Sequence, residues 1–588
     1  MRFSQRPSAN LIFIVLLSAS WLTWSRSGPA QDEGQSGAEP AAAEGFFEAV
    51  DVEIVNIDVW VTDKSGRHVP GLTRDDFQIY RDGDPVGTTN FYAVENGRPA
   101  ETVQPVERQL AEDGEAPSSE REGLRSPLAP EHRLRLVVFV DNFNSAPLER
   151  NRVLPALRQF LGNTVRHGDE VMLVSFDRSL RVRQPFTRST DLVFAQLDEL
   201  YDDAGFVPAR RRQQMETLRR IDTSREGSYA LGLALTYAES EMHDVEATAD
   251  AMRELIETIA GMPGRKALLH VSSGVPMAAG EEMFHAVAEK FDDGRAYSEI
   301  GRHDTSRAFE RVARHANAHR VVFYTLDAGG NRGMHYANAE YGGFVSPNLR
   351  RTLDSVVPEN LQSTLRLLAQ ETGGRAIVNR NEVLPGLEEV ASDLRTFYSL
   401  GIANANVDHG RYHQIKVELV DRDLRKKYQV RHRRGYRPRS QDSRMVDGLR
   451  SSLLYGFEEN PIGFTAVWGR PVPHDREDHY LLPVQLSIPL RDLVLLPVAG
   501  GKYELRLKLY VGVADERGDL SEIDRVPLGL RIEEQHLEAA QGESFLYTHQ
   551  LIPDRGRRKV GLTVLDLVGG KTSIVTRAVR VGTETSGS

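Results

Sequence analysis

Side chains that carry oxygen ligands follow three stretches of the sequence that are predicted to be buried strands. These side chains belong to the segment Asp141-Asn142-Phe143-Asn144-Ser145 and to the single residues Ser273 and Asp327. In a doubly wound parallel sheet, the crevice beyond the carboxyl ends of the strands is the natural place for a ligand. We therefore expect Asn142, Asn144, Ser273 and Asp327 to lie on the rim of a binding site.

Simpler roles exist for two of these carboxylates, and both alternatives stay open at the level of sequence. Asp141 can cap the helix that follows it or accept hydrogen bonds from the N–H groups of its own loop. Asp327 can be an ordinary turn residue, because aspartate side chains bond readily to nearby backbone groups.

Motifs that would indicate an enzyme are incomplete. Gly569-Gly570-Lys571-Thr572 ends like a phosphate-binding loop, but position 565, where such a loop needs glycine, is leucine. This segment also lies between two predicted strands, so it opens no helix that could hold phosphate and is predicted to be a hairpin turn. Ser272-Ser273-Gly274 lacks the leading glycine of a nucleophile elbow.

Histidines and paired carboxylates give no catalytic pattern either. None of the 17 histidines stands in a His-Glu-x-x-His arrangement, and Asp75-Asp76 and Asp202-Asp203 lie in turn-like contexts. We therefore predict a protein without catalytic activity. A cell-envelope hydrolase with an unrecognised site is kept as a further alternative.

The middle of the chain alternates buried strands with helices. The run 134–140 is almost continuously apolar, which is typical of a strand that is buried on both faces of a parallel sheet. The other predicted strands are 170–176, 266–272, 320–326 and 375–378, and the predicted helices are 147–161, 191–201, 229–241, 360–371 and 384–394. This order predicts an α/β fold with a doubly wound, mostly parallel sheet that is covered on both sides.

The regions on either side of this domain have β character. Residues 46–98 and 395–437 each contain too few strands to bury a sheet face alone, so we expect the two segments to pair, with residues 132–394 inserted between them. Residues 99–131 are rich in Glu, Pro, Ser and Arg and are predicted to be a linker. Residues 438–588 are predicted to form a C-terminal β-sandwich-like domain.

The N-terminus has the pattern of an export signal. Arg2 and Arg6 precede the apolar stretch from Leu11 to Trp24, and small residues lead to a predicted cleavage point near Ala30. An apolar stretch of this length is shorter than the roughly 20 residues that span a bilayer, although an uncleaved N-terminal anchor is the alternative. We expect residues 1–30 to be a signal peptide, residues 31–45 to be a disordered linker, and the protein to be secreted or periplasmic, with no membrane span after cleavage.

Composition excludes several functions. The chain has no cysteine, which rules out disulfides, thiolate catalysis and cysteine-based zinc sites. Its 73 basic and 84 acidic side chains give a net charge of −11. Its basic runs, such as Arg210-Arg211-Arg212, are short, whereas nucleic-acid binding needs a clustered positive surface. We therefore expect no nucleic-acid partner.

Several phrases spread over about residues 50–437 resemble a known family. They are Gly71-Leu72-Thr73-Arg74-Asp75-Asp76-Phe77, Asp82-Gly83, the segment from Asp169 to Phe176, Thr372-Gly373-Gly374-Arg375-Ala376, and the closing Tyr398-Ser399-Leu400-Gly401 through Arg434-Gly435-Tyr436. In these phrases the chain resembles bacterial von Willebrand factor A-related domain proteins. The resemblance implies a von Willebrand A fold with its ligand site at the carboxyl ends of the strands.

The resemblance also implies a Mg²⁺ site, and this sequence departs from it. Relatives hold the ion by Asp-x-Ser-x-Ser after the first strand, a threonine from a second loop and an aspartate from a third. Asp141 and Ser145 match, but Phe143 replaces the first serine, Ser228 stands in for the threonine, and Ser273 replaces the aspartate. Because lost charged ligands weaken the attraction for a divalent ion, we expect at most a weak, degenerate metal site at Asp141, Ser145 and Ser228.

These observations predict an exported adhesion or scaffolding protein that binds a protein partner outside the cytoplasm and needs no cofactor. The predicted binding rim comprises the loops 141–146, 226–230, 273–277 and 327–345. The alternative is Mg²⁺-dependent binding of an acidic protein ligand through the residual metal site. Neither the partner's identity nor an oligomeric state follows from the sequence.

Overall fold

The computed structural model describes residues 54–99, 133–166, 168–331, 346–403 and 410–582. The predicted signal peptide, the predicted disordered linker, most of the linker at 99–131 and most of the rim loop at 327–345 lie outside the described residues. Within the described part of the chain, no helix combines the length and apolarity that crossing a bilayer requires.

The central α/β domain is built on a six-stranded sheet with the order β11-β10-β9-β6-β7-β8. The strands are β6 (Leu134–Asp141), β7 (Glu170–Phe176), β8 (Leu180–Thr187), β9 (Arg265–Ser272), β10 (Val321–Asp327) and β11 (Ala376–Ile377). All neighbours pair in parallel except β8, which is antiparallel to β7. The prediction of a mostly parallel sheet is confirmed. Its direction of winding reverses between β6 and β9, as in doubly wound folds.

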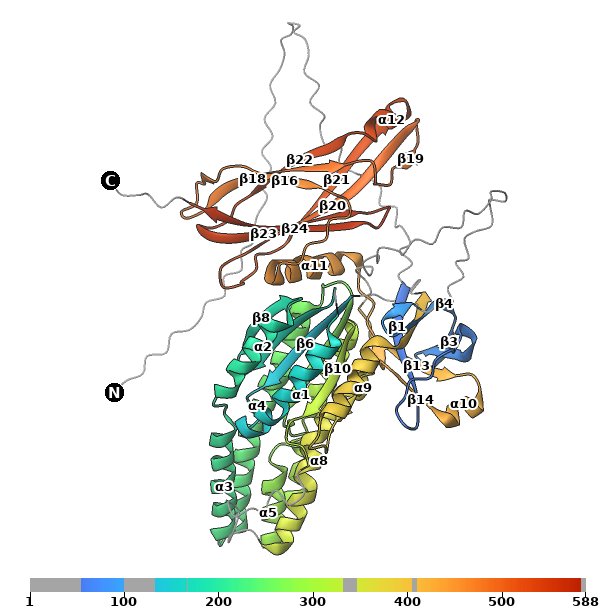
Figure 1. Cartoon of the computed structure of the whole chain (residues 1–588). Helices are drawn as coiled ribbons and strands as arrows, with labels where there is room; N and C mark the ends of the chain where they lie inside the picture. The colour runs from blue at the N-terminus through green and yellow to red at the C-terminus, as the bar shows by residue number, and fades with distance from the viewer. Residues whose placement is uncertain (1–53, 100–132, 167, 332–345, 404–409, 583–588) are drawn as a thin grey trace, which may run out of the picture. The chain divides into compact units, whose positions relative to one another are not determined.

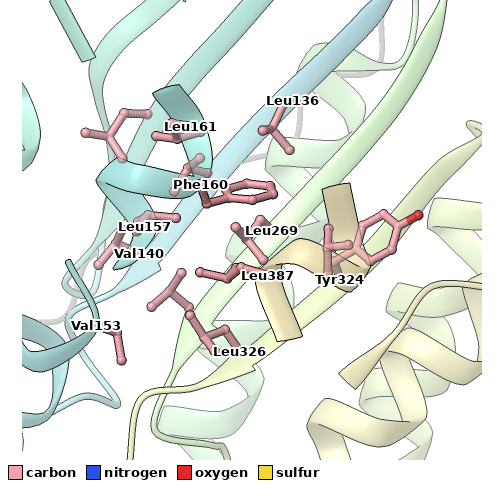
Figure 2. Close-up of a cluster of buried hydrophobic side chains, with 14 of the residues drawn as sticks. Leu136, Val140, Val153, Leu157, Phe160, Leu161, Leu269, Tyr324, Leu326 and Leu387 are labelled. Carbon is pink, nitrogen blue, oxygen red and sulfur yellow. The ribbon is translucent and has the colours of Figure 1, made fainter. Parts of the chain in front are cut away.

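Strand β6 lies in the interior of the sheet, between β9 and β7. All eight of its residues are buried, because successive side chains point to opposite faces and both faces are covered. Leu136 and Val140 pack against Phe160, Leu161 and other apolar side chains of the first core (Figure 2). Residues Val137 and Phe139 belong to the second core on the other face.

Helices cover both faces of the sheet. The first core holds side chains of α1 (Pro147–Thr164), α2 (Thr190–Glu199) and α9 (Leu384–Arg395). The second core holds side chains of α4 (Gly227–Ile259), α7 (Ser306–Ala318) and α8 (Pro347–Thr372).

Helices also extend beyond the sheet, and sequence analysis did not expect this part (Figure 1). Helix α3 (Val207–Thr223), the first half of α4, α5 (Glu281–Phe291), α6 (Gly294–Arg302) and the start of α8 share a separate apolar core. We call this part the helical extension. Its core is built largely from small side chains such as Ala230, Ala234 and Ala238, which let the helices lie close together.

The two flanking β segments pair with each other, as their strand content suggested. Strand β1 (Ile54–Asp63) lies between β12 (Phe397–Ala403) and β14 (Tyr428–His432), and β2 (Phe77–Arg81) pairs with β13 (His413–Leu419). The remaining strands are β3 (Asp84–Val86), β4 (Thr88–Glu95), β5 (Arg98–Pro99) and β15 (Gly435–Tyr436), with one short helix, α10 (Arg422–Lys427). Val55 and Ile415 belong to one apolar cluster, so residues far apart in sequence form one β unit.

The C-terminal region contains two antiparallel sheets with a shared apolar core. One has β16 (Thr465–Trp468), β17 (Val472–Pro473), β18 (Tyr480–Pro489) and β22 (Ser544–Leu551); the other has β19 (Leu496–Val498), β20 (Lys502–Ala514), β21 (Asp524–Glu533), β23 (Gly556–Asp566) and β24 (Thr572–Val581). A short helix, α12 (Leu537–Ala540), precedes β22. Gly569-Gly570 forms the turn between β23 and β24, as the hairpin interpretation expected.

Helix α11 (Gln441–Tyr455), which sequence analysis missed, connects the β unit to these sheets. Its Leu449 and Leu453 pack in a small core with Tyr510 of β20. Tyr455 Oη donates a hydrogen bond to Thr258 Oγ1 of α4 at 2.7 Å. Gly261, just after the end of α4, lies against the backbone of α11. A Cβ at Gly261 would lie 2.0 Å from the backbone carbonyl carbon of Asp447, so only glycine fits there.

Candidate functional site

Asp141, the last residue of β6, is fully buried and bonded to its own loop. Its Oδ1 accepts a hydrogen bond from the backbone N–H of Asn144 at 3.0 Å. Its Oδ2 accepts bonds from Asn144 Nδ2 at 2.9 Å and from Ser272 Oγ at 2.8 Å. The simpler of the two sequence interpretations therefore describes Asp141: it accepts N–H groups of its loop and ties that loop to the end of β9.

Ser145 and Ser273 join the loops that follow β6 and β9. Ser145 Oγ accepts a hydrogen bond from the backbone N–H of Ser273 at 3.0 Å. Ser273 Oγ donates to Glu149 Oε2, in the first turn of α1, at 2.7 Å. Both serines are buried, so these bonds hold the two loops in one fixed arrangement.

Asn142 is held by a second group of charged side chains. Its Oδ1 accepts a hydrogen bond from Arg150 Nη1 at 3.1 Å, and its Nδ2 donates to Asp203 Oδ2 at 3.0 Å. Arg183 Nη2 also donates to Asp203 Oδ2, at 2.6 Å. Asn142 is therefore part of the fixed loop and is only 1% exposed, which removes it from any accessible rim.

Arg210 of α3 places a positive charge directly on the loop after β6. Its Nη1 donates to Asn144 Oδ1 at 2.7 Å, and its guanidinium lies 5.0 Å from the centre of the Phe143 ring. The Phe143 ring packs against Phe176 and Phe206, at centroid distances of 5.8 and 5.7 Å. Phe143, which the sequence resemblance aligned with a metal-binding serine, thus forms an aromatic surface for a guanidinium.

Two carboxylates of α4 lie beside this arginine. Arg210 Nε is 3.6 Å from Asp244 Oδ2, and Arg210 Nη2 is 3.7 Å from Glu241 Oε1. Burial, and after it the neighbouring carboxylate of Glu282, raises the pKa of Glu241 to about 8. Glu241 is therefore mostly protonated at neutral pH.

Ser228 does not lie near this loop, so its assignment as a metal ligand was wrong. It is exposed in the first turn of α4, whereas Thr248, twenty residues further along that helix, is the residue that contacts Asn144 Nδ2, at 3.2 Å. A helix rises about 1.5 Å per residue, which puts Ser228 roughly 30 Å from the loop. The segment 226–230 was expected to be a rim loop but is the far end of a long helix.

Asp327 has the turn role that its simpler interpretation gave it. Its Oδ1 accepts the backbone N–H of Gly329 at 2.8 Å, and its Oδ2 accepts a bond from Gln362 Nε2 of α8 at 2.9 Å. It is 1% exposed. The rim assignment for Asp327 was therefore also wrong, since its carboxylate is used inside the fold.

The expected open rim is covered by the helical extension. Residues 141–145 are all buried, and Gly274 is approached by Leu361 of α8. A cavity of about 120 Å³ remains at this edge. Asn144 and Ser273 of the predicted rim line it, together with Glu149, Val207, Arg210, Arg211, Gln214, Tyr237, Glu241, Gly274, Pro276, Val357, Pro358 and Leu361.

This arrangement of donors does not fit Mg²⁺. The ion demands about six oxygens in octahedral geometry. Both carboxylate oxygens of Asp141 and the hydroxyl of Ser145 already accept hydrogen bonds, Phe143 offers no oxygen, and Ser228 is distant. Among the described residues, no three His, Asp or Glu side chains are grouped so that they could hold a metal.

Few features of the sequence indicated the residues that complete this site. Arg210 belongs to the short basic run Arg210-Arg211-Arg212, and α3 carries few apolar residues that would mark it as a buried helix. His270 of β9 is fully buried, with its ring 5.3 Å from Phe139 and its Nε2 3.6 Å from Asp141 Oδ2. A histidine inside an apolar strand was the one sequence feature that could have indicated a polar contact at this place.

Comparisons with known proteins give weak likenesses. No known family matches the sequence, and no curated protein matches it. Among solved structures, BatB of Bacteroides thetaiotaomicron is 10% identical, with a TM-score of 0.22, over 44% of this chain and 97% of that chain. A variant of the PilB minor pilin of Streptococcus sanguinis is 9% identical, with a TM-score of 0.25, over 60% and 80%. Manganese-loaded TRAP of Plasmodium vivax is 9% identical, with a TM-score of 0.20, over 53% and 96%.

Proposed function

We propose that this chain is an exported, non-catalytic protein-binding protein whose α/β domain is a von Willebrand A-type domain that works without a metal ion. The N-terminal pattern of residues 1–30 supports export. The strand order, with its reversal between β6 and β9, supports the domain type. The observation that carries the proposal is the position of Arg210.

Arg210 supplies a fixed positive charge at the loop where the family places its cation. A guanidinium stays protonated at every physiological pH, whereas a bound Mg²⁺ depends on its supply and on free ligand oxygens. The contacts of Arg210 with Asn144, Phe143 and Asp244 fix its position. The loop after β6 is thus held in one conformation by the chain itself.

The cavity beside Arg210 suits one side chain of a partner protein. Its volume of about 120 Å³ is below the roughly 300–1,000 Å³ of small-molecule sites. Its lining includes the apolar side chains of Val357, Pro358 and Leu361 and the charged side chains of Arg211 and Glu149. Small pockets of this kind take the anchoring side chains of protein interfaces.

Capture of the partner from an envelope extract tests this proposal. The mature chain is the bait, in buffer with Mg²⁺ and in buffer with EDTA, and we expect the same partner to be retained in both. Arg211→Glu, which reverses a charge in the cavity wall, is expected to weaken capture about tenfold or more, as loss of a charged interface contact does.

Arg212→Glu is the matched control, because Arg212 is the next residue of α3, is exposed and does not line the cavity. Capture that is unchanged in Arg211→Glu, or equally weakened in both variants, would contradict the proposed surface. Loss of capture in EDTA would favour the Mg²⁺-dependent alternative.

A further inference from the structure

A second cavity lies at the opposite edge of the sheet, at the amino ends of β9 and β10. It has a volume of about 250 Å³, and segments of the β unit, the α/β domain and α11 all line it. Its basic side chains are Lys266, Arg320, Arg433, Arg437, Arg439 and Arg444. Asp447 is the one acidic side chain among the described residues that line it.

The basic groups in this cavity repel one another. Burial, and then the charges of Arg320 and Arg135, lowers the pKa of Lys266 to about 7. Burial, and then Arg439, lowers the pKa of His319 to about 2, so His319 is neutral and accepts a hydrogen bond from Arg439 at 2.8 Å. Asp447 pairs with Arg439, so the described residues that line the cavity offer no further carboxylate to Arg320, Arg433 and Arg437.

The hydrogen bonds of the deepest groups go to uncharged partners. Arg433 is 8% exposed, and its guanidinium donates to the backbone oxygens of Asn317 and Asn56, each at 2.9 Å. Lys266 Nζ donates to the backbone oxygen of Met262 at 2.9 Å. A buried cation costs free energy unless an anion compensates it.

Arg320 and Arg437 are placed to receive such an anion. Both are exposed and both line the cavity. Within the described part of the chain, neither guanidinium has a hydrogen bond or an ion pair. Arg320 precedes β10 with a left-handed backbone, at φ 58°, a conformation that costs free energy for a side chain other than glycine or asparagine.

A third cavity, of about 420 Å³, adjoins this one and extends the basic surface. The two share residues Ala318, His319, Arg437, Arg439 and Asp447. Among titratable side chains, the third cavity adds His315, Arg450 and one carboxylate, Glu257. A ligand longer than a single phosphate can therefore reach from one cavity into the other.

We propose that this paired cavity binds a small anion that carries phosphoryl groups, with Arg320 and Arg437 bonding to its oxygens at the entrance. The planar fork of a guanidinium matches the oxygens of a phosphoryl group and forms paired, charge-assisted hydrogen bonds with it. Because the lining comes from three parts of the chain, the bound anion fastens the β unit, the α/β domain and α11 together.

Isothermal titration of the mature chain with pyrophosphate tests this proposal. We expect saturable one-to-one binding that weakens as potassium chloride is added, since salt screens exposed charges. Arg320→Glu and Arg437→Glu are each expected to weaken binding by about tenfold or more, the loss of one charged hydrogen bond. Sulfate at equal ionic strength distinguishes phosphoryl recognition from a general preference for divalent anions, and weaker binding of sulfate is expected.

Arg225→Glu is the matched control. Arg225 is exposed and precedes α4, whereas Ala260, in the cavity wall, follows the end of that 33-residue helix, so the two are roughly 50 Å apart. Thermal melts give a second readout, because a ligand of the folded state raises the melting temperature. Pyrophosphate should stabilise wild type and Arg225→Glu, but not the two cavity variants. Absence of saturable binding to wild type, or equal weakening in Arg225→Glu, would overturn the proposal.

Discussion

Single residues decide what the edge of the sheet can do. A metal-binding aspartate must keep lone pairs free for the ion, but Asp141 accepts three hydrogen bonds from Asn144 and Ser272. Phe143, at the position where the resemblance implies a serine, offers no oxygen ligand and forms a surface for Arg210. The matching pair Asp141 and Ser145 was visible in the sequence, but both bond to the end of β9, at Ser272 and the next residue, which sequence spacing does not bring to them.

The raised pKa of Glu241 predicts a pH-dependent stability. Its pKa in the folded state is about 8, above the ordinary value of 4.5, so the folded protein binds more protons between these values. The stabilisation is therefore fully present below about pH 4.5 and is lost as the pH rises through 8. We expect Glu241→Gln to flatten the fall in unfolding free energy between pH 5 and 8, measured by urea melts.

Glu239→Gln is the control, since Glu239 is exposed on the same helix. The groups that face Glu241 are Arg210, Asp244 and Glu282, and all three are unchanged in both variants. An equal pH slope in Glu241→Gln and wild type would show that this carboxyl does not carry the effect.

At the level of elements, the strands with a continuous apolar pattern could be predicted from the sequence. Strand β7 begins and ends as predicted, and β6, β9 and β10 differ from the prediction by one residue at one or both ends, because each is a run buried on both faces. Strand β8 was missed because it is an edge strand with mixed, half-exposed residues.

The helices were harder to predict, and this changed the site. The sequence pattern predicted helices at residues 229–241 and 360–371, whereas α4 has 33 residues and α8 has 26. The missed first half of α8 packs against other helices and not against the sheet, in a core of small side chains that has little apolar contrast with the exposed face. For α4 the first half was predicted, and the missed second half packs against the sheet. Helices α3, α5 and α6 were not predicted. The helical extension that covers the predicted rim was therefore not foreseen.

At the level of the whole molecule, Asp393 joins the inserted domain to the β unit. This residue of α9 is fully buried, and its carboxylate accepts bonds from Arg431 of β14 at 2.7 and 2.8 Å and from Arg375 at 3.2 Å. His68 Nε2 lies 3.0 Å from Asp393 Oδ1, and Trp60 Nε1 of β1 donates a hydrogen bond to the backbone oxygen of Asp393. One side chain thus connects segments more than 300 residues apart.

Asp393→Asn is expected to lower the free energy of unfolding by about 3–5 kcal/mol, because it leaves buried arginines without their partner. Despite the cost of burial, hydrogen bonding to His68 and the charges of Arg431 and Arg375 hold the pKa of Asp393 at about 2. This stabilisation is present above about pH 3.8, the ordinary pKa, and is lost as the pH falls through 2. Chemical denaturation at pH 7 and pH 2.5 measures both effects.

Glu389→Gln provides the comparison for that measurement. Glu389 lies one turn earlier on α9 and also pairs with Arg375, at 2.7 Å, but its side chain is 35% exposed. A partly exposed pair contributes less than about 1 kcal/mol. Equal losses in the two variants would mean that the connection between the domain and the β unit does not depend on Asp393.

Metal independence is the central claim, and calorimetric titration of Mg²⁺ and Mn²⁺ into the mature chain tests it most directly. Since Asp141 and Ser145 already accept hydrogen bonds within the fold and Arg210 supplies the charge, we predict no saturable heat and no rise in melting temperature with either ion. Saturable binding in wild type that is lost in Asp141→Ala and in Ser145→Ala would contradict the account.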